Sequence, residues 1–128
     1  MIFPKDFLFG AATSAIQYEG SSLVDGKGLS VNDIRFKEHG IENPETSLCS
    51  DGYHRYLEDI ELMKELGLKS YRFSISWSRI CPNGDGEFNS LGIQYYHNVI
   101  DALVKNHIEP VITLFHFDLP FESEGDIL

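Results

Sequence analysis

The chain has 128 residues, which is enough for one domain with a hydrophobic core, and its 42% hydrophobic and 23% charged residues are typical of a soluble globular protein. Its formal net charge of −10 argues against a nucleic-acid partner, because proteins that bind phosphate backbones concentrate Lys and Arg. The charge is compatible with neutral substrates, and it does not exclude an anionic substrate held in a local cationic pocket.

Cysteine spacing and the N-terminal residues predict a protein of a reducing compartment. Cys49 and Cys81 show neither CxxC spacing nor a zinc-binding pattern, so two idle thiols are favoured over a disulfide between them. The opening residues MIFPKDFLFG lack the basic region and long apolar run of a signal peptide. No apolar run approaches the roughly 20 residues of a membrane helix. We therefore expect a cytoplasmic protein without a membrane partner.

The first element is predicted as a strand followed by a long loop. Residues 6–15, DFLFGAATSA, begin apolar and aromatic and then become small, which is typical of a buried strand that opens into a loop. Residues 17–50 show no sustained period and are rich in Gly, Asn, Asp and Ser. A loop of this length in a compact domain is more often functional than accidental.

The next two elements are predicted as a helix and a strand. From Ser50 to Leu66 apolar residues recur at the i, i+3, i+4, i+7 spacing of an amphipathic helix, and Gly67 is suited to end it. Residues 69–77, KSYRFSISW, alternate in size and are rich in aromatic and β-branched side chains, which predicts a strand.

A second helix and a third strand complete the pattern. The helical stripe runs from Ile93 to His107, with Asn89 or Ser90 as its N-cap. Residues 109–117, EPVITLFHF, predict the third strand.

Alternation of strands and helices predicts right-handed parallel βαβ units, and so an α/β fold. Three strands and two helices do not complete a common parallel fold, because a closed (β/α)8 barrel takes about 250 residues. The chain reads as the beginning of a larger unit, and its open sheet edge invites self-association.

Polar side chains follow all three predicted strands. The first strand is followed by Gln17 and Glu19, the second by residues 74–79, and the third by His116 and Asp118. The carboxyl ends of parallel strands meet at one edge, so these groups are expected to face one mouth. Amide, imidazole and carboxylate groups together suit a polyhydroxylated ligand, and neighbouring aromatic rings could support a sugar: Tyr18, Trp77, Phe115 and Phe117.

Each candidate also has a structural explanation. A single histidine at a strand end is often a structural residue, and Glu19 could cap a nearby loop. Arg72 lies in the middle of a strand, where a charge is costly unless paired, so we expect a carboxylate beside it. No close histidine pair or calcium-loop pattern is present, so neither a metal nor another cofactor is expected.

The chain resembles glycoside hydrolase family 1, the β-glucosidases, β-galactosidases and their 6-phospho relatives. Four segments carry the resemblance, in the order and spacing of the family: FPKDFLFGAATSAIQYEG, DGYHRYLEDIELMKELGLKSYRFSISWSRI, NSLGIQYYHNVIDAL and IEPVITLFHFDLP. The resemblance implies a (β/α)8 TIM barrel, of which residues 1–128 supply the N-terminal portion of a single catalytic domain, with the first three strands and two helices. It implies a small-molecule glycoside as substrate and the remainder of the barrel as partner.

The resemblance also assigns roles to individual residues in a retaining mechanism. Gln17 and His116 look like the residues that hydrogen-bond the hydroxyl groups of the sugar in the −1 subsite, and Phe117 like a further substrate contact. Arg72 looks like the strand arginine that lies beside the catalytic nucleophile and keeps it ionised.

Both catalytic carboxylates of the family are missing from this sequence. The family carries its acid/base Glu in an Asn-Glu-Pro segment and its nucleophile in a Glu-Asn-Gly segment, and neither segment occurs here. Residues 41–44, IENP, have the wrong order, and residues 108–110, IEP, lie at the start of the third strand, away from the mouth, so both are rejected as catalytic. The chain alone is expected to be inactive.

The phosphorylation state of the substrate stays open at this point. Phe117 stands where many β-glucosidases of the family have Trp, and together with GKGLSVND and HFDLPFESEGDIL it resembles the 6-phospho enzymes. β-Glucosides and 6-phospho-β-glucosides or galactosides are both retained as substrates. The alternative is a non-catalytic sugar-binding or interaction module, or an inactive truncated product.

Overall fold

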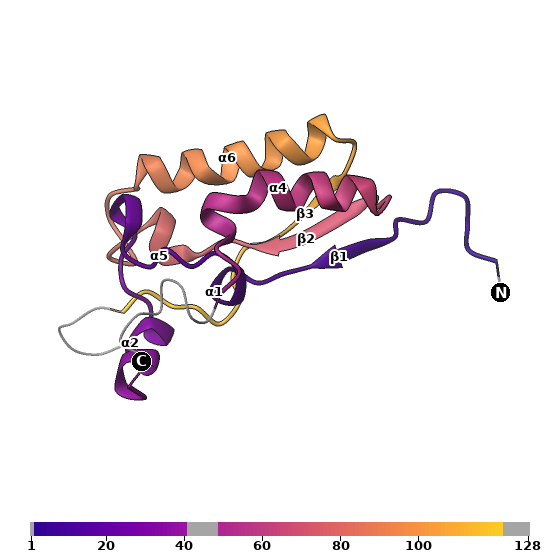
Figure 1. Cartoon of the computed structure of the whole chain (residues 1–128). Helices are drawn as coiled ribbons and strands as arrows, with labels where there is room; N and C mark the ends of the chain where they lie inside the picture. Colours follow the sequence, from indigo (N-terminus) through magenta and orange to yellow (C-terminus); the bar gives the residue numbers. More distant parts are fainter. Residues whose placement is uncertain (1, 41–48, 122–128) are drawn as a thin grey trace.

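The computed structural model describes residues 2–40 and 49–121. Its centre is a sheet of three parallel strands in the order β1-β2-β3, namely β1 (Gly10–Ala12), β2 (Ser70–Ser74) and β3 (Glu109–Thr113). Two long helices, α4 (Gly52–Glu65) and α6 (Ser90–Lys105), lie side by side over one face of the sheet (Figure 1). Each helix joins one strand to the next parallel strand, which confirms the predicted βαβ order.

The two long helices begin and end where the sequence predicts. Asn89 caps α6, since its Oδ1 accepts a hydrogen bond of 3.3 Å from the backbone N–H of Leu91. Gly67, just after α4, takes φ +75, a conformation that is easy for glycine and strained for other residues.

The hydrophobic core lies between the helices and one face of the sheet. Tyr71 and Phe73 of β2 are buried on this face, whereas Arg72 between them is exposed on the opposite face, because successive strand residues point to opposite sides. The other core side chains are Tyr53 and Ile60 from α4, Tyr95, Tyr96, Val99 and Leu103 from α6, and Ile108 just before β3.

The third strand is shorter than predicted. It ends at Thr113, which pairs with Ser74, the last residue of β2. A strand cannot continue the ladder beyond its only partner, so the prediction that the strand extends to Phe117 is wrong. His116 and Phe117 therefore lie in a loop beyond the strand. The second strand also stops short, and Trp77 begins the short helix α5 (Trp77–Ile80).

The prediction of one structureless loop over residues 17–50 is wrong for its described part. This part contains the end of α1 (Ala15–Tyr18), a 3-10 turn η1 (Val24–Gly26) and the helix α2 (Val31–Glu38). Ser30 and Asp33 form a capping box at the start of α2. Only one side chain of α2 is buried, and it is the aspartate Asp33. The helix therefore packs no apolar face against the core.

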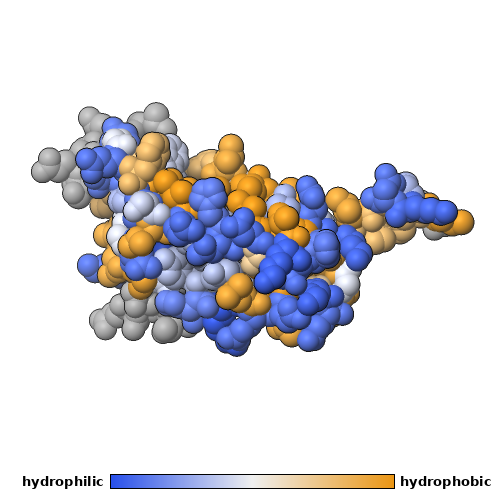
Figure 2. Space-filling model, turned by 90° about the horizontal axis from the view of Figure 1, so that it is seen from above, coloured by the Kyte–Doolittle hydropathy of each residue, from blue (hydrophilic) through white to orange (hydrophobic). Residues whose placement is uncertain are grey.

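The outer surface of the helix layer is mixed in polarity. Seen from the side of α6 and α4, hydrophilic side chains cover much of the surface, with hydrophobic patches between them (Figure 2). Several large apolar side chains are exposed, among them Phe88, Leu114 and Phe117. In Figure 1 no helix covers the second face of the sheet in the way that α4 and α6 cover the first.

Two further observations concern the expected cellular environment. Cys49 and Cys81 are both free thiols, and Cys81 is buried. No helix within residues 2–40 and 49–121 combines the length and apolar character needed to cross a membrane. The cytoplasmic location stays a prediction from the sequence.

Two core tyrosines generate a prediction about alkaline pH. Burial raises the pKa of Tyr53 to about 12 and the pKa of Tyr71 to about 12, whereas an exposed tyrosine titrates near 10. Between these values the unfolded chain loses phenolic protons that the folded chain keeps, so the free energy of unfolding should fall as pH rises from 10 to 12. Urea unfolding at stepped pH values measures this loss. Tyr71→Phe should make the decline shallower, and a flat profile in the parent chain would contradict the argument.

Candidate functional site

The candidate site lies at the carboxyl ends of the three strands. The segment after β1 forms α1, the segment after β2 forms α5, and the segment after β3 is a loop over residues 114–121. This loop pairs with the first long loop through an antiparallel bridge between Ser30 and Pro120. Loops from distant parts of the sequence thus meet at the edge where α/β proteins place their ligands.

Gln17 is exposed on the short helix α1. Its Oε1 accepts a hydrogen bond of 2.7 Å from Ser14 Oγ, which leaves the side-chain NH2 group free to donate to a ligand. The residue follows β1 by five positions, as expected for a group displayed at the mouth.

His116 and Phe117 occupy the loop that follows β3. The imidazole is half-buried, with its ring centre 5.6 Å from that of Phe117. Phe117 is 81% exposed and has φ 57, an unusual conformation for a bulky residue. Asn32 Nδ2 donates to the Phe117 carbonyl oxygen at 3.2 Å and so helps to hold this turn.

Arg72 is exposed on the uncovered face of the sheet. Its Nε donates to Thr113 Oγ1 at 2.8 Å. No carboxylate pairs with Arg72 within residues 2–40 and 49–121, so the acid expected beside it is not found in the described part of the chain. Gln17, Arg72 and His116 come from three neighbouring strands, but no hydrogen bond links them directly.

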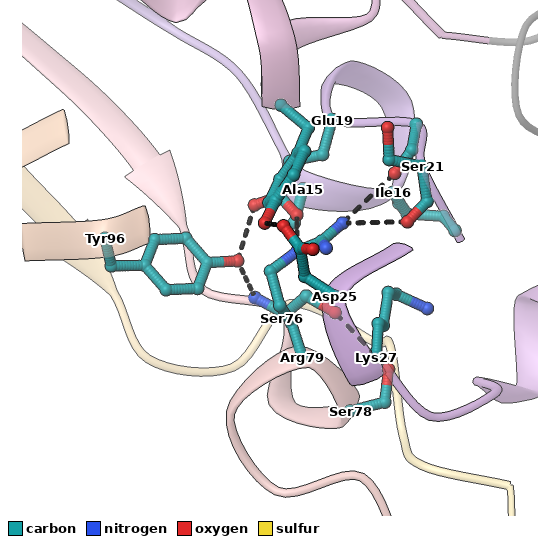
Figure 3. A network of polar contacts seen from close by, with 12 residues as sticks. Ala15, Ile16, Glu19, Ser21, Asp25, Lys27, Ser76, Ser78, Arg79 and Tyr96 are labelled. Carbon is teal, nitrogen blue, oxygen red and sulfur yellow. Dashed lines mark hydrogen bonds and ion pairs between the residues drawn. The ribbon is translucent and has the colours of Figure 1, made fainter. Parts of the chain in front are cut away.

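The strongest polar contact of the region is a buried ion pair between Glu19 and Arg79. Arg79 Nε donates to Glu19 Oε2 at 2.8 Å, and the two residues are 1% and 3% exposed for Arg79 and Glu19 respectively (Figure 3). Arg79 Nη2 also donates to the carbonyl oxygens of Gly20 and Ser21, at 3.1 and 3.4 Å. Burial alone would lower the pKa of the guanidinium, but the charge of Glu19, the hydrogen bond to Glu19 and the neighbouring Tyr96 and Tyr53 together leave the pKa above its ordinary value.

Tyrosines complete the surroundings of this pair. The Tyr96 hydroxyl donates to Glu19 Oε1 and accepts from the backbone N–H of Ser76 at 2.7 Å. Burial raises the pKa of Tyr96 well above its usual value, and the charge of Glu19 raises it further, so the phenol stays protonated and donates. The Arg79 guanidinium carbon lies 4.2 Å from the centre of the Tyr53 ring, a cation–π contact.

Glu19 therefore has a structural contact, but its carboxylate pairs with Arg79 and Tyr96 rather than capping a nearby loop as the alternative supposed. Arg79 lay inside the candidate span of residues 74–79, but its role and that of Tyr96 were missed. A charged residue in the apolar and serine-rich stretch after a strand, such as Arg79 in SISWSRI, is a signal for a buried ion pair.

Asp118 is a second candidate that the structure assigns to the scaffold. It is buried and accepts hydrogen bonds from Asn32 Nδ2 at 3.2 Å and from Ser76 Oγ at 3.4 Å. A second buried ion pair joins Lys27 Nζ to Asp33 Oδ2 at 2.8 Å. Most of the polar groups at the carboxyl ends of the strands thus form hydrogen bonds or ion pairs with one another.

Aromatic side chains lie beside these polar groups. The Trp77 and Phe115 rings make an edge-to-face contact with centres 6.4 Å apart, and Phe117 lies 6.2 Å from Phe115. All three rings are partly exposed, so they offer the apolar surface on which sugar rings commonly rest.

The cavity at the candidate site is too small to hold a sugar. A cavity of about 20 Å³ beside Glu19, Arg79 and Asp118 has room for a water molecule but not for a sugar. A hollow of about 370 Å³ lies near Lys69 and His107, at the opposite, amino-terminal end of the strands.

No group of three potential metal ligands exists among the described residues. Residues 41–44, rejected as catalytic, lie outside the described residues, and Glu109 begins β3, far from the mouth.

Comparison with known proteins explains why the cavity at this end of the strands is so small. A family model described as Glycosyl hydrolase family 1 matches residues 1–126. A coniferin beta-glucosidase of Pinus contorta is 58% identical over 92% of the chain, which corresponds to 23% of that protein. An aryl-phospho-beta-D-glucosidase of Bacillus subtilis is 50% identical over 92% of the chain and 25% of that protein.

Solved structures agree with this assignment. The beta-glucosidase from Thermotoga maritima, in complex with castanospermine, superposes with a TM-score of 0.87 at 43% identity, over 92% of this chain and 27% of that one. The chain thus spans about a quarter of the length of the relatives it matches. Its three parallel strands and covering helices are part of a (β/α)8 barrel, which confirms the predicted fold class.

The buried ion pair generates a stability prediction. Glu19→Gln leaves the Arg79 charge buried without its partner, so we expect the free energy of unfolding to fall by about 3–5 kcal/mol, or cooperative unfolding to be lost. Urea unfolding followed by circular dichroism measures the change. Glu58→Gln is the matched control, because Glu58 forms an exposed pair with Arg55 at 2.8 Å and should leave the unfolding midpoint unchanged. Equal effects of the two substitutions would contradict the argument.

Proposed function

Because this chain belongs to glycosyl hydrolase family 1, we propose that residues 1–128 are the N-terminal portion of the single catalytic domain of a retaining β-glycosidase. The chain supplies one side of the site that binds the sugar. The observation that carries the proposal is that Gln17 and His116 lie in the segments that follow β1 and β3, and that Arg72 lies in β2, the strand between these two.

Gln17 and His116 bind the hydroxyl groups of the sugar. A carboxamide both donates and accepts hydrogen bonds, and a neutral imidazole does so through its two nitrogens, so each can bind adjacent hydroxyls. The exposed carboxamide of Gln17 and the half-buried ring of His116 support this role. Phe117 adds an exposed aromatic face for the ring of the substrate.

Arg72 acts on the catalytic nucleophile through charge. A cation within a few ångströms of a carboxyl group lowers its pKa, and so keeps a nucleophilic carboxylate ionised at neutral pH. This role is supported by its exposed position and by its lack of a carboxylate partner among residues 2–40 and 49–121.

The bond-breaking chemistry belongs to groups that this sequence does not contain. A retaining glycosidase uses two carboxyl groups about 5–5.5 Å apart, one as nucleophile and one as acid and base. The sequence has neither the Asn-Glu-Pro nor the Glu-Asn-Gly segment in which the family carries them. The contribution of this chain is therefore binding and orientation of the sugar.

The substrate class that we propose is β-glucosides, either free or phosphorylated at the 6 position. The relatives include both a coniferin beta-glucosidase and an aryl-phospho-beta-D-glucosidase. Phe117 in place of the more usual Trp favours the 6-phospho form.

A second candidate function, self-association, is favoured by the exposed edge strand β3. Val111 of this strand and Leu114 just beyond it are both largely exposed. We expect sedimentation velocity of the chain to show species larger than 14.5 kDa at increasing concentration. Val111→Lys should reduce this association, because charged side chains block edge-to-edge pairing. A monomer at every concentration would rule out this candidate.

The main proposal is tested by a chimera in which the full 128-residue chain replaces the matching N-terminal quarter of the Thermotoga maritima beta-glucosidase. The isolated chain should hydrolyse neither nitrophenyl β-glucoside nor its 6-phosphate, whereas the chimera should hydrolyse at least one. In the chimera, Gln17→Ala and His116→Ala should each lower kcat/KM about 10-fold or more, since each removes a hydrogen bond to the sugar.

Exposed residues of α6 provide matched controls for this experiment. Gln94→Ala and His97→Ala remove the same two residue types from the outer surface and should leave kcat/KM unchanged. The proposal fails if the Gln17 and His116 variants behave like these controls, or if the isolated chain shows turnover that a substitution within it abolishes.

A further inference from the structure

We propose that the buried Glu19–Arg79 pair is a positioning device that fixes the orientation of Gln17, and so affects catalysis through Gln17 without touching the substrate. This inference rests on the proposed function, because it takes Gln17 as a sugar contact. It concerns two residues that the proposed function leaves without a role.

The helix that carries Gln17 is too short to hold its own conformation. α1 has only four residues, and no side chain caps its N-terminus. One helical turn fixes several backbone angles for a single hydrogen bond, so an isolated turn is unstable in water. The position of Gln17 is therefore set by contacts of α1 with other elements, which include Tyr18 with Asp59 and the contacts at the two ends of α1.

The first end of α1 is tied to strand β2. The backbone N–H of Ala15 donates to Ser74 Oγ at 2.7 Å, and the N–H of Thr13 donates to the Arg72 carbonyl oxygen at 2.9 Å. The Thr13 hydroxyl also contacts the hydroxyl of Tyr71. These contacts link the start of α1 to the strand that carries Arg72.

The second end of α1 is tied by Glu19, two residues after Gln17. Its backbone N–H closes the turn on the Ala15 carbonyl oxygen at 2.9 Å, and its side chain binds Arg79 and Tyr96. The two ends of α1 are thus anchored to different elements, and Gln17 lies between the anchors.

Arg79 is itself held rigidly, so the second anchor is firm. Its carbonyl oxygen accepts a hydrogen bond of 3.0 Å from Asn89 Nδ2, the residue that caps α6. A Cβ atom on Gly92 would lie 2.1 Å from the same oxygen, so only glycine lets α6 approach α5 this closely. The guanidinium is fixed by Glu19, by two carbonyl oxygens and by the Tyr53 ring.

An ion pair suits positioning better than it suits stability. Replacing a buried ion pair by apolar residues of similar volume is often neutral or stabilising, so stability alone does not call for Glu and Arg here. The guanidinium donates one hydrogen bond to Glu19 and two to carbonyl oxygens, and these directional bonds fix its angle as well as its distance, which an apolar contact does not. We therefore infer that the ion pair acts through its fixed geometry, which holds α1 and so orients Gln17.

Two conservative substitutions separate geometry from size. Glu19→Gln keeps the side-chain volume and removes the charge, so it loosens the bond to Arg79. Arg79→Lys keeps the charge and removes the fork that reaches the carbonyl oxygens of Gly20 and Ser21. Either change should let α1 reorient in the molecules that stay folded, and the rates are compared per folded molecule.

The test is a double-mutant cycle with Gln17→Ala in the chimera described above, with kcat/KM measured on the substrate that the chimera hydrolyses, nitrophenyl β-glucoside or its 6-phosphate. We expect Glu19→Gln to lower kcat/KM about 10-fold when Gln17 is present and less than about 2-fold when Gln17 is already Ala, because the effect is transmitted through Gln17. Arg79→Lys should show the same coupling. Glu58→Gln, which alters an exposed pair, should change nothing in either background.

The outcomes distinguish this inference from the proposed function. If the losses from Glu19→Gln and Gln17→Ala multiply, the pair has only a structural role and the inference is overturned, while Gln17 remains a sugar contact. If Gln17→Ala alone has no effect, the proposed role of Gln17 fails and the inference fails with it. Circular dichroism at the assay temperature corrects each rate for the folded fraction, so that loss of folding does not mimic coupling.

Discussion

The buried contact between Glu19 and Arg79 is the constraint on which the carboxyl end of this sheet depends. It joins the segment after the first strand to the segment after the second, and Tyr96 ties both to α6. Two charges buried this deeply tolerate little displacement, because each needs the other at hydrogen-bond distance. Short segments without stable structure of their own thereby acquire defined positions.

The two faces of the sheet differ in their surroundings. Tyr71 and Phe73 face the helices and build the core, whereas Arg72 projects from the opposite face. That second face corresponds to the interior of a closed barrel, which is filled by side chains from all of its strands. Arg72 is held by Thr113 alone among its described neighbours, which suits a cation whose partner comes from another strand.

The fold was predictable wherever a repeating pattern reflects burial. The apolar spacing of α4 and α6 and the aromatic content of β2 identified these elements, with Asn89 as cap. α2 was missed because it buries little and shows no stripe, although Ser30 and Asp33 carry a capping signal. The end of β3 and the pairing of Glu19 depend on residues far away in sequence, so no local pattern reveals them. For the site residues, the strand-end rule supplied the location and the family resemblance supplied the roles.

The segment before α2 and the loop after β3 are joined by an antiparallel contact. This contact has a consequence for how such a site can evolve. The N–H of Val31 donates to the Leu119 carbonyl oxygen at 2.9 Å, and the N–H of Phe121 donates to that of Leu29 at 2.7 Å. Insertions or deletions between Gln17 and Leu29 would therefore pull on the turn that carries His116. Because these hydrogen bonds join the two segments, a change in the length of one should be accompanied by a change in the other among relatives. Each strand should keep its register.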